Sequence, residues 1–225
     1  MSKEKDYIEN IPDAERRYFT APVTIETRAE DGEGSTIEGY AALFNSTTNI
    51  GSWYAEEIAA GAFDEVLKDD VRCLFNHDPN QILARSQDGK GTLTLSVDSK
   101  GLKYSYVTPD RSYARDLEDA ISKGDVSQSS FAFSVKESTW IEAEEGSGEL
   151  DKRIIKRFGK LYDVAPVTYP AYQDTSVAKR SYDAFKAKDI EVETEEDNVN
   201  KENSRAEKLD VFEAQYLHNK NKLKS

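Results

Sequence analysis

Residues 124–135 read GDVSQSSFAFSV, and the second half of this stretch alternates between small and large side chains. The small residues Ser130, Ala132 and Ser134 fall on one face. The large apolar residues Phe131, Phe133 and Val135 fall on the other. A period of two residues, carried by aromatic and β-branched side chains, predicts a half-buried β-strand. Because the face opposite the aromatic rings is small, another group can approach Ser130 closely.

A serine hydroxyl becomes a nucleophile when a neighbouring base takes its proton. The chain offers two histidines, His77 and His218. His77 follows the apolar run VRCLF at residues 71–75, so we expect it at the end of a strand, where side chains emerge into clefts. The alternative is a surface-turn histidine with no partner of this kind.

Three other serines, Ser127, Ser129 and Ser134, are rivals of Ser130 on the same segment. If the alternation holds, Ser129 points toward the aromatic side. A third group is needed to orient the imidazole. Asp163 lies within the apolar run LYDVAPV at residues 161–167, where a carboxylate is costly without a partner. Its alternative is an exposed position on an edge strand.

The remaining pattern predicts a mainly β, α+β fold in the form of a small barrel or sandwich. Helical periodicity indicates a short helix at 61–67 and another with its N-cap at Asp110 and its end at Gly124. The expected strands are residues 19–27 and 37–44 as a hairpin, 53–58, 71–75, 93–97 and 102–107 as a second hairpin, 128–135, 154–155 and 161–167. Residues 142–151 are expected to form a loop.

Composition excludes several classes of function. The 225-residue chain has a formal net charge of −13, which argues against nonspecific binding to nucleic acid. A single cysteine, Cys73, fits a reducing compartment, and on a strand it would lie about 13 Å from His77, too far for a dyad. No clustered metal ligands, cofactor motif, signal peptide or membrane-spanning stretch is apparent, so we expect no cofactor, metal or membrane.

Changes in composition divide the chain into three parts. Residues 1–16 are expected to form a flexible N-terminal arm, and residues 17–182 a single domain. Residues 183–225 are expected to form an acidic linker, followed by an amphipathic helix at about 204–217.

Four short motifs occur in the order and approximate spacing of a known family: GAF at 61–63, LFNHD at 74–78, GDVS–SFAF at 124–133, and DV with PAY between 163 and 172. The pattern resembles the prohead (capsid maturation) proteases of tailed phages over roughly residues 18–175. Those enzymes are similar to the herpesvirus assemblins, which have a β-barrel ringed by helices. The resemblance therefore implies a small β-barrel of the herpesvirus-protease type.

The resemblance also implies roles and partners. Ser130 would be the nucleophile, His77 the general base and Asp163 the third member, at a position where the family usually has glutamate. The function implied is a serine endopeptidase that processes the major capsid protein, the scaffold and itself in the procapsid of a bacteriophage, within the host cytoplasm. Self-association as a homodimer is implied too. The alternative is a non-catalytic assembly or scaffold factor that acts through protein contacts.

Overall fold

The structure is a computed structural model that describes residues 11, 13–19, 23–27, 34–169 and 178–187. The chain divides into two compact units, Met1–Arg180 and Ser181–Ser225. Of the second unit, residues 181–187 are described, and they are helical. The amphipathic helix expected at 204–217 lies outside the described residues. No helix in the described part is long and apolar enough to cross a membrane.

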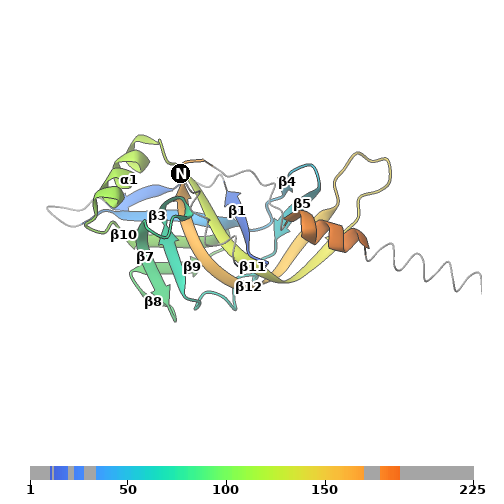
Figure 1. The fold of residues 1–225 in the computed structure, drawn as a ribbon, viewed down its shortest axis with the longest axis horizontal. Helices are drawn as coiled ribbons and strands as arrows, with labels where there is room; N and C mark the ends of the chain where they lie inside the picture. Colours follow the sequence, from blue (N-terminus) through green and yellow to red (C-terminus); the bar gives the residue numbers. More distant parts are fainter. Residues whose placement is uncertain (1–10, 12, 20–22, 28–33, 170–177, 188–225) are drawn as a thin grey trace, which may run out of the picture. The chain divides into compact units, whose positions relative to one another are not determined.

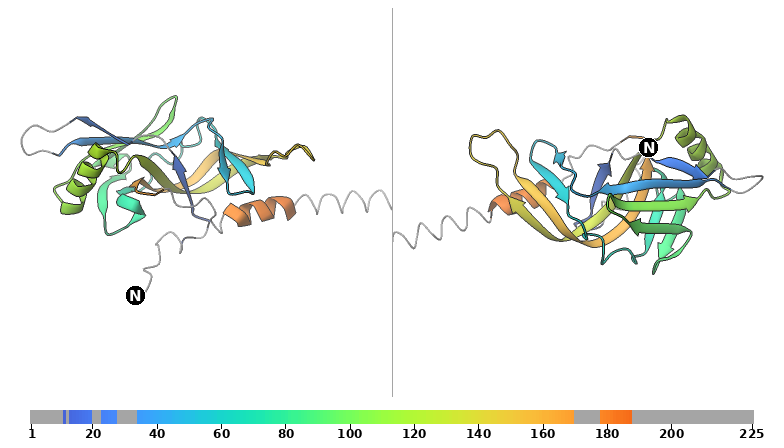
Figure 2. Two further views of the ribbon diagram at one scale, coloured as in Figure 1. Left: turned by 90° about the horizontal axis from the view of Figure 1, so that it is seen from above. Right: turned by 180° about the vertical axis from the view of Figure 1, so that it is seen from behind.

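Two sheets form the first unit (Figures 1 and 2). The eight-stranded sheet has the order β1–β11–β12–β6–β7–β8, with β5 paired to β12 and β4 to β5. Its strands are β1 (Glu15–Phe19), β4 (Thr48–Ile50), β5 (Tyr54–Ile58), β6 (Val71–Leu74), β7 (Ile82–Gln87), β8 (Lys90–Gly91), β11 (Gln128–Ile141) and β12 (Lys152–Val167). The four-stranded sheet has the order β2–β3–β10–β9, from β2 (Thr24–Thr27), β3 (Thr36–Leu43), β9 (Leu93–Val97) and β10 (Gly101–Val107).

The expected mainly β class with flanking helices is confirmed, although the two sheets are not closed into a barrel among the described residues. At the N-terminal end, one expected strand is divided between the two sheets. The sequence predicted one strand over 19–27, whereas β1 and β2 are separate strands that pair in different sheets, with β11 and β3 respectively. The strand β1 begins at Glu15, within the segment 1–16 that was expected to form an N-terminal arm.

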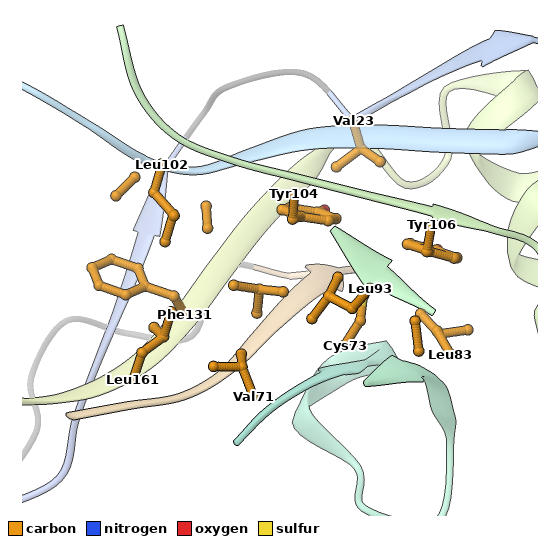
Figure 3. Close-up of a cluster of buried hydrophobic side chains, with 14 of the residues drawn as sticks. Val23, Val71, Cys73, Leu83, Leu93, Leu102, Tyr104, Tyr106, Phe131 and Leu161 are labelled. Atoms are coloured by element: carbon orange, nitrogen blue, oxygen red, sulfur yellow. The ribbon is translucent and has the colours of Figure 1, made fainter. Parts of the chain in front are cut away.

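The main core lies between the two sheets. Tyr104 and Leu102 of β10 meet Phe131 of β11 and Leu161 of β12, as Figure 3 shows. Four phenylalanine rings pack together at its centre as two stacked pairs, with centroids 4.4 Å apart for Phe63–Phe158 and 4.6 Å apart for Phe131–Phe133. The alternating face recognised in the sequence therefore supplies the core, and leaves the face with Ser130 for other contacts.

Both predicted hairpins, β2–β3 and β9–β10, are present. The helix α1 (Ser112–Lys123) is confirmed as well, and Gly124 ends it in the left-handed conformation with φ of 81°. Its N-cap is Arg111 and not Asp110. The helix expected at 61–67 is wrong. These residues form successive turns closed by bonds between residues three apart, such as the Val66 N–H donating to the Phe63 carbonyl at 3.0 Å.

A buried ionic cluster joins three strands near the N-terminal end of β12. Its members are Glu15 and Arg17 of β1, Glu56 of β5 and Arg153 of β12, all at most 4% exposed. Arg17 bonds to Glu15 at 2.5 Å and also to Glu56, while Arg153 bonds to Glu15 at 3.0 Å and to Glu56 at 3.3 Å. Two cations and two anions compensate one another, which makes burial of all four tolerable.

Candidate active site

His77 lies in a tight turn, Phe75–His77, directly after β6. Its backbone is left-handed with φ of 59°, and that of Asn76 is left-handed with φ of 54°. Asparagine and histidine are among the few residues that adopt this conformation with some frequency. The loop closes on itself, because the Phe75 N–H donates to the Gln81 carbonyl at 3.1 Å and the Asn80 N–H to Asp78 Oδ1 at 2.8 Å. His77 is 6% exposed.

Ser130 lies on β11 with its side chain on the face away from the aromatic core. In the sheet it pairs with Tyr18 of β1 on one side and with Ala165 of β12 on the other. Ser129 points the opposite way, as the alternation predicted, and its hydroxyl lies 2.9 Å from the Tyr104 hydroxyl. Ser130 itself is fully buried in this structure.

Asp163 lies on β12, which is an interior strand of the eight-stranded sheet. It pairs with Ala132 of β11 and with Arg72 of β6. The alternative placement on an exposed edge is therefore wrong, since Asp163 is 0% exposed. Because β12 runs between β11 and β6, it brings the carboxylate beneath the turn that follows β6.

The structure brings the three predicted site residues together. His77 Nε2 lies 2.6 Å from Ser130 Oγ, and His77 Nδ1 lies 2.6 Å from Asp163 Oδ1. A carboxylate can only accept hydrogen bonds, so the tautomer that fits has the proton on Nδ1, donating to Asp163. Nε2 is then the acceptor for the Ser130 hydroxyl proton. This geometry has the order of groups found in a serine–histidine–acid triad.

The rival serines do not take this position. Ser129 bonds to Tyr104, Ser127 is exposed before the start of β11, and Ser134 Oγ lies against Gly159. Ser130 is thus the serine of this segment that meets the imidazole.

Two other side chains, Cys73 and Arg85, do not belong to this hydrogen-bonded triad. Burial, with a contribution from the Asp163 carboxylate, raises the pKa of the Cys73 thiol well above its usual value. A thiol that stays protonated is a poor nucleophile. Arg85 forms a two-point ion pair with Asp70, at 2.6 and 2.8 Å, on the surface. Among the described residues no cluster of potential metal ligands occurs.

One contact of this site had no counterpart in the sequence analysis. Asn76 Oδ1 accepts a hydrogen bond from the Thr168 N–H at 2.8 Å, and Asn76 Nδ2 donates one to Thr168 Oγ1 at 3.1 Å. Thr168 directly follows β12. The sequence does show an asparagine next to a histidine at the end of a strand. No local pattern identifies Thr168 as the partner of that asparagine, because the two residues are 92 positions apart.

Comparison with known proteins places the chain in a family. The family of caudovirus prohead serine proteases matches residues 23–188. The chain belongs to this family. The matched range includes His77, Ser130 and Asp163.

Two relatives illustrate the likeness. The chain is 31% identical over 152 residues to the prohead protease of Enterobacteria phage HK97, and the match covers 66% of this chain. It spans 61% of the length of that relative. Among solved structures, the capsid assembly protease of bacteriophage T4 is similar with a TM-score of 0.42 and 15% identity, covering 72% of this chain and 100% of that one. The family assignment does not depend on the second likeness.

Proposed function

We propose that this protein is a serine endopeptidase that processes capsid and scaffold proteins, and itself, during prohead maturation. Ser130 is the nucleophile, His77 the general base and Asp163 the residue that orients the imidazole. The observation that carries the proposal is the continuous path from Ser130 Oγ through His77 to Asp163, with 2.6 Å at each step. Membership of the prohead serine protease family supports the same reading.

The reaction follows from the positions of the protons. Ser130 Oγ attacks the scissile carbonyl carbon while His77 Nε2 takes the hydroxyl proton. The imidazolium that forms keeps its Nδ1–H directed at Asp163, whose negative charge stabilises it. The imidazolium then gives its proton to the leaving amine. Water hydrolyses the resulting acyl-enzyme with His77 again as the base, which restores Ser130.

The substrates we propose are the major capsid protein and the scaffold, encountered inside the procapsid in the host cytoplasm. The protease domain is residues 17–182. The tail, residues 183–225, tethers the enzyme to scaffold or capsid protein and is removed by self-cleavage. A homodimer is the form we expect for the active enzyme. These assignments extend from the family membership of this chain, and the measurements below test the nucleophile, the processing of capsid protein and the removal of the tail.

The first test does not require a substrate. A fluorophosphonate ester reacts with an activated serine, which forms an Oγ–P bond and displaces fluoride while the histidine takes the proton. We expect the wild-type chain to gain one phosphonyl group, located at Ser130 by peptide mass spectrometry. Ser130→Ala and His77→Ala should not react. The matched controls are Ser129→Ala and Ser134→Ala, which remove the rival hydroxyls on the same strand. Labelling of Ser129 or Ser134 in the wild type would refute the assignment.

The second test addresses the substrate. Wild type and Ser130→Ala are each incubated with the cognate capsid protein during assembly, and all chains are weighed by intact-mass spectrometry. Fragments that form with the wild type alone support serine-dependent processing, and the masses give the cleavage sites. If assembly and processing are identical with both chains, the non-catalytic scaffold role replaces the proposal. A mature protein that retains residues 190–225 would contradict self-removal of the tail.

A further inference from the structure

The proposed base, His77, and the residue before it adopt an unusual backbone conformation. Asn76 and His77 are consecutive non-glycine residues with positive φ, 54° and 59°. Each such residue costs on the order of 1 kcal/mol or more and persists only where its surroundings hold it. The imidazole lies within 2.6 Å of two partners. The position of this backbone therefore has to be fixed by contacts between this turn and other parts of the chain.

The bonds within the loop give it a shape. Phe75 N–H donates to the Gln81 carbonyl, and the Asp78 N–H donates to the Phe75 carbonyl at 3.0 Å. Asp78 Oδ1 also accepts from the Asn80 N–H at 2.8 Å. These bonds all lie within the loop. They therefore do not fix the orientation of the loop relative to β12, which depends on other contacts.

The Asn76 side chain supplies such a contact. Its amide makes two parallel hydrogen bonds to Thr168, one to the backbone N–H at 2.8 Å and one to the hydroxyl at 3.1 Å. Thr168 follows Val167, the last residue of β12, and Asp163 lies on the same strand. The residue next to the proposed base is thus attached to the strand that carries the proposed acid.

We propose that Asn76 is a positioning residue that holds the His77 ring between Asp163 and Ser130 by locking the turn to the end of β12. The inference rests on the proposed function for its kinetic effect, although the contact itself concerns His77 alone. Misplacement of a reacting group by about 1 Å can cost roughly 100-fold in rate. Loss of the amide therefore lowers the maximal rate of reaction at Ser130 and leaves the affinity for small reagents unchanged.

The variant Asn76→Gly distinguishes the effect of the side-chain amide from the effect of the backbone conformation. Glycine adopts positive φ freely, so this variant keeps the backbone and loses both contacts to Thr168. We expect the maximal rate of fluorophosphonate labelling to fall by about 10- to 100-fold, with little change in the concentration giving half-maximal rate. Asn80→Ala, in the same loop but without a bond to β12, is the matched control and should label at the wild-type rate. If Asn76→Gly also labels at that rate, the inference is overturned.

Thr168 offers a second, independent pair of variants. Thr168→Val removes the hydroxyl at nearly constant shape, and we expect the labelling rate to fall by about 2- to 10-fold, which corresponds to one hydrogen bond. Thr168→Ser keeps the hydroxyl and should restore the rate. Equal rates for these two variants would contradict the role of the side-chain contact. Thermal unfolding of every variant checks that the fold is retained, and this pair decides the matter if Asn76→Gly does not fold.

Nuclear magnetic resonance gives a readout that does not need activity. The chain has two histidines, so ¹⁵N-histidine labelling of the full chain, with His218→Gln for assignment, isolates the His77 ring. A protected Nδ1–H signal is expected in the wild type and its loss in Asn76→Gly. If the wild type fails to react with the probe but shows this dependence, the proposed function fails and the positioning role stands. If the signal persists in Asn76→Gly, the positioning role fails.

Discussion

A carboxylate at position 163 has two tasks in the proposed reaction. It selects the histidine tautomer that leaves Nε2 free to accept a proton, and it stabilises the imidazolium that forms. Both tasks depend on Oδ1 acting as an acceptor 2.6 Å from His77 Nδ1. The position of Asp163 on an interior strand, with 0% exposure, keeps water from competing for this contact.

Asp163→Asn changes the acceptor into a group that can also donate, at almost constant size. We expect the labelling rate at Ser130 to fall by about 10⁴-fold, because the amide favours the tautomer with its proton on Nε2. Asp163→Ala should be comparably slow. Asp151→Asn, a buried carboxylate that accepts from the Ala143 N–H at 2.9 Å outside the site, is the control. Near-normal labelling of Asp163→Asn would remove Asp163 from the mechanism.

At the scale of elements, a buried hydrogen bond ties the strand that carries Ser130 to the opposite sheet. The Tyr104 hydroxyl of β10 lies 2.9 Å from Ser129 Oγ of β11. Gly39 makes room for it, since a Cβ at that position would lie 2.6 Å from the Tyr104 hydroxyl oxygen. Burial raises the pKa of Tyr104, so the hydroxyl stays neutral.

Removing one partner of this pair leaves the other buried without a hydrogen bond. We expect Tyr104→Phe and Ser129→Ala each to lower the free energy of unfolding by about 1–3 kcal/mol. The double variant should lose less than the sum of the two, because no polar group is then stranded. Urea unfolding of the four chains measures this coupling. Strictly additive losses would show that the two hydroxyls do not act as a pair.

The ionic cluster is the second connection between elements. The side chain of Arg153 on β12 is 5% exposed, whereas the side chain of Arg157 on the same strand is 49% exposed. Arg153→Met leaves Glu15 and Glu56 short of a cation, and we expect a loss of about 3–5 kcal/mol in unfolding free energy. Arg157→Met breaks a surface pair with Glu137 and should cost at most about 1 kcal/mol. Similar losses in both would mean that burial adds nothing to the pairing.

Elements differ in how far local sequence determines them. The strand at 128–135 and the helix ending at Gly124 follow from periodicity and a left-handed C-cap. Residues 61–67 have a helix-like pattern, but the positions of Phe63 and Val66 in the core are reached through turns. The strands β1 and β2 appear continuous in the sequence, and the choice of a different sheet for each depends on partners more than 100 residues away for β1.

The candidate site could be predicted from the sequence, whereas the contacts that hold it in place could not. His77, Ser130 and Asp163 belong to short motifs with characteristic chemistry, so each could be named from residue type, position and resemblance. The Asn76–Thr168 contact and the ionic cluster join residues separated by 92 and up to 138 positions. Such pairs depend on the register of the sheet, which the pattern of a single strand does not specify.

At the scale of the whole molecule, the cluster links stability to pH. Burial alone would raise the pKa of the Glu15 carboxyl, but Arg17 and Arg153 outweigh it and hold that pKa below its usual value. The folded protein therefore binds the proton less well than the unfolded chain, for which a glutamate pKa is about 4.3. The stabilisation is complete above that pH and is lost as the pH falls through the folded-state pKa.

We therefore expect the free energy of unfolding to decrease below about pH 4.3, where the unfolded chain binds a proton at Glu15 more readily than the folded protein does. Glu15→Gln should be less stable at pH 7, with a shallower dependence on pH in the acid range. Glu65→Gln serves as the control, because the pKa of Glu65 is lowered by Lys136 at an exposed position where solvent weakens the effect. Urea titrations at several pH values distinguish them, and parallel curves for wild type and Glu15→Gln would rule out the linkage.

The interior strand β12 also determines when the candidate site can form during synthesis of the chain. Its 16 residues pair with β11, β5 and β6, and it is the last described strand to leave the ribosome. Until it arrives, β1 and β11 have no sheet in common with β6, so His77 and Ser130 are not held face to face. Pairings across such sequence distances form slowly. If the proposed chemistry holds, an incompletely synthesised chain cannot cleave other proteins. The catalytic residues are brought together only when β12 joins the sheet.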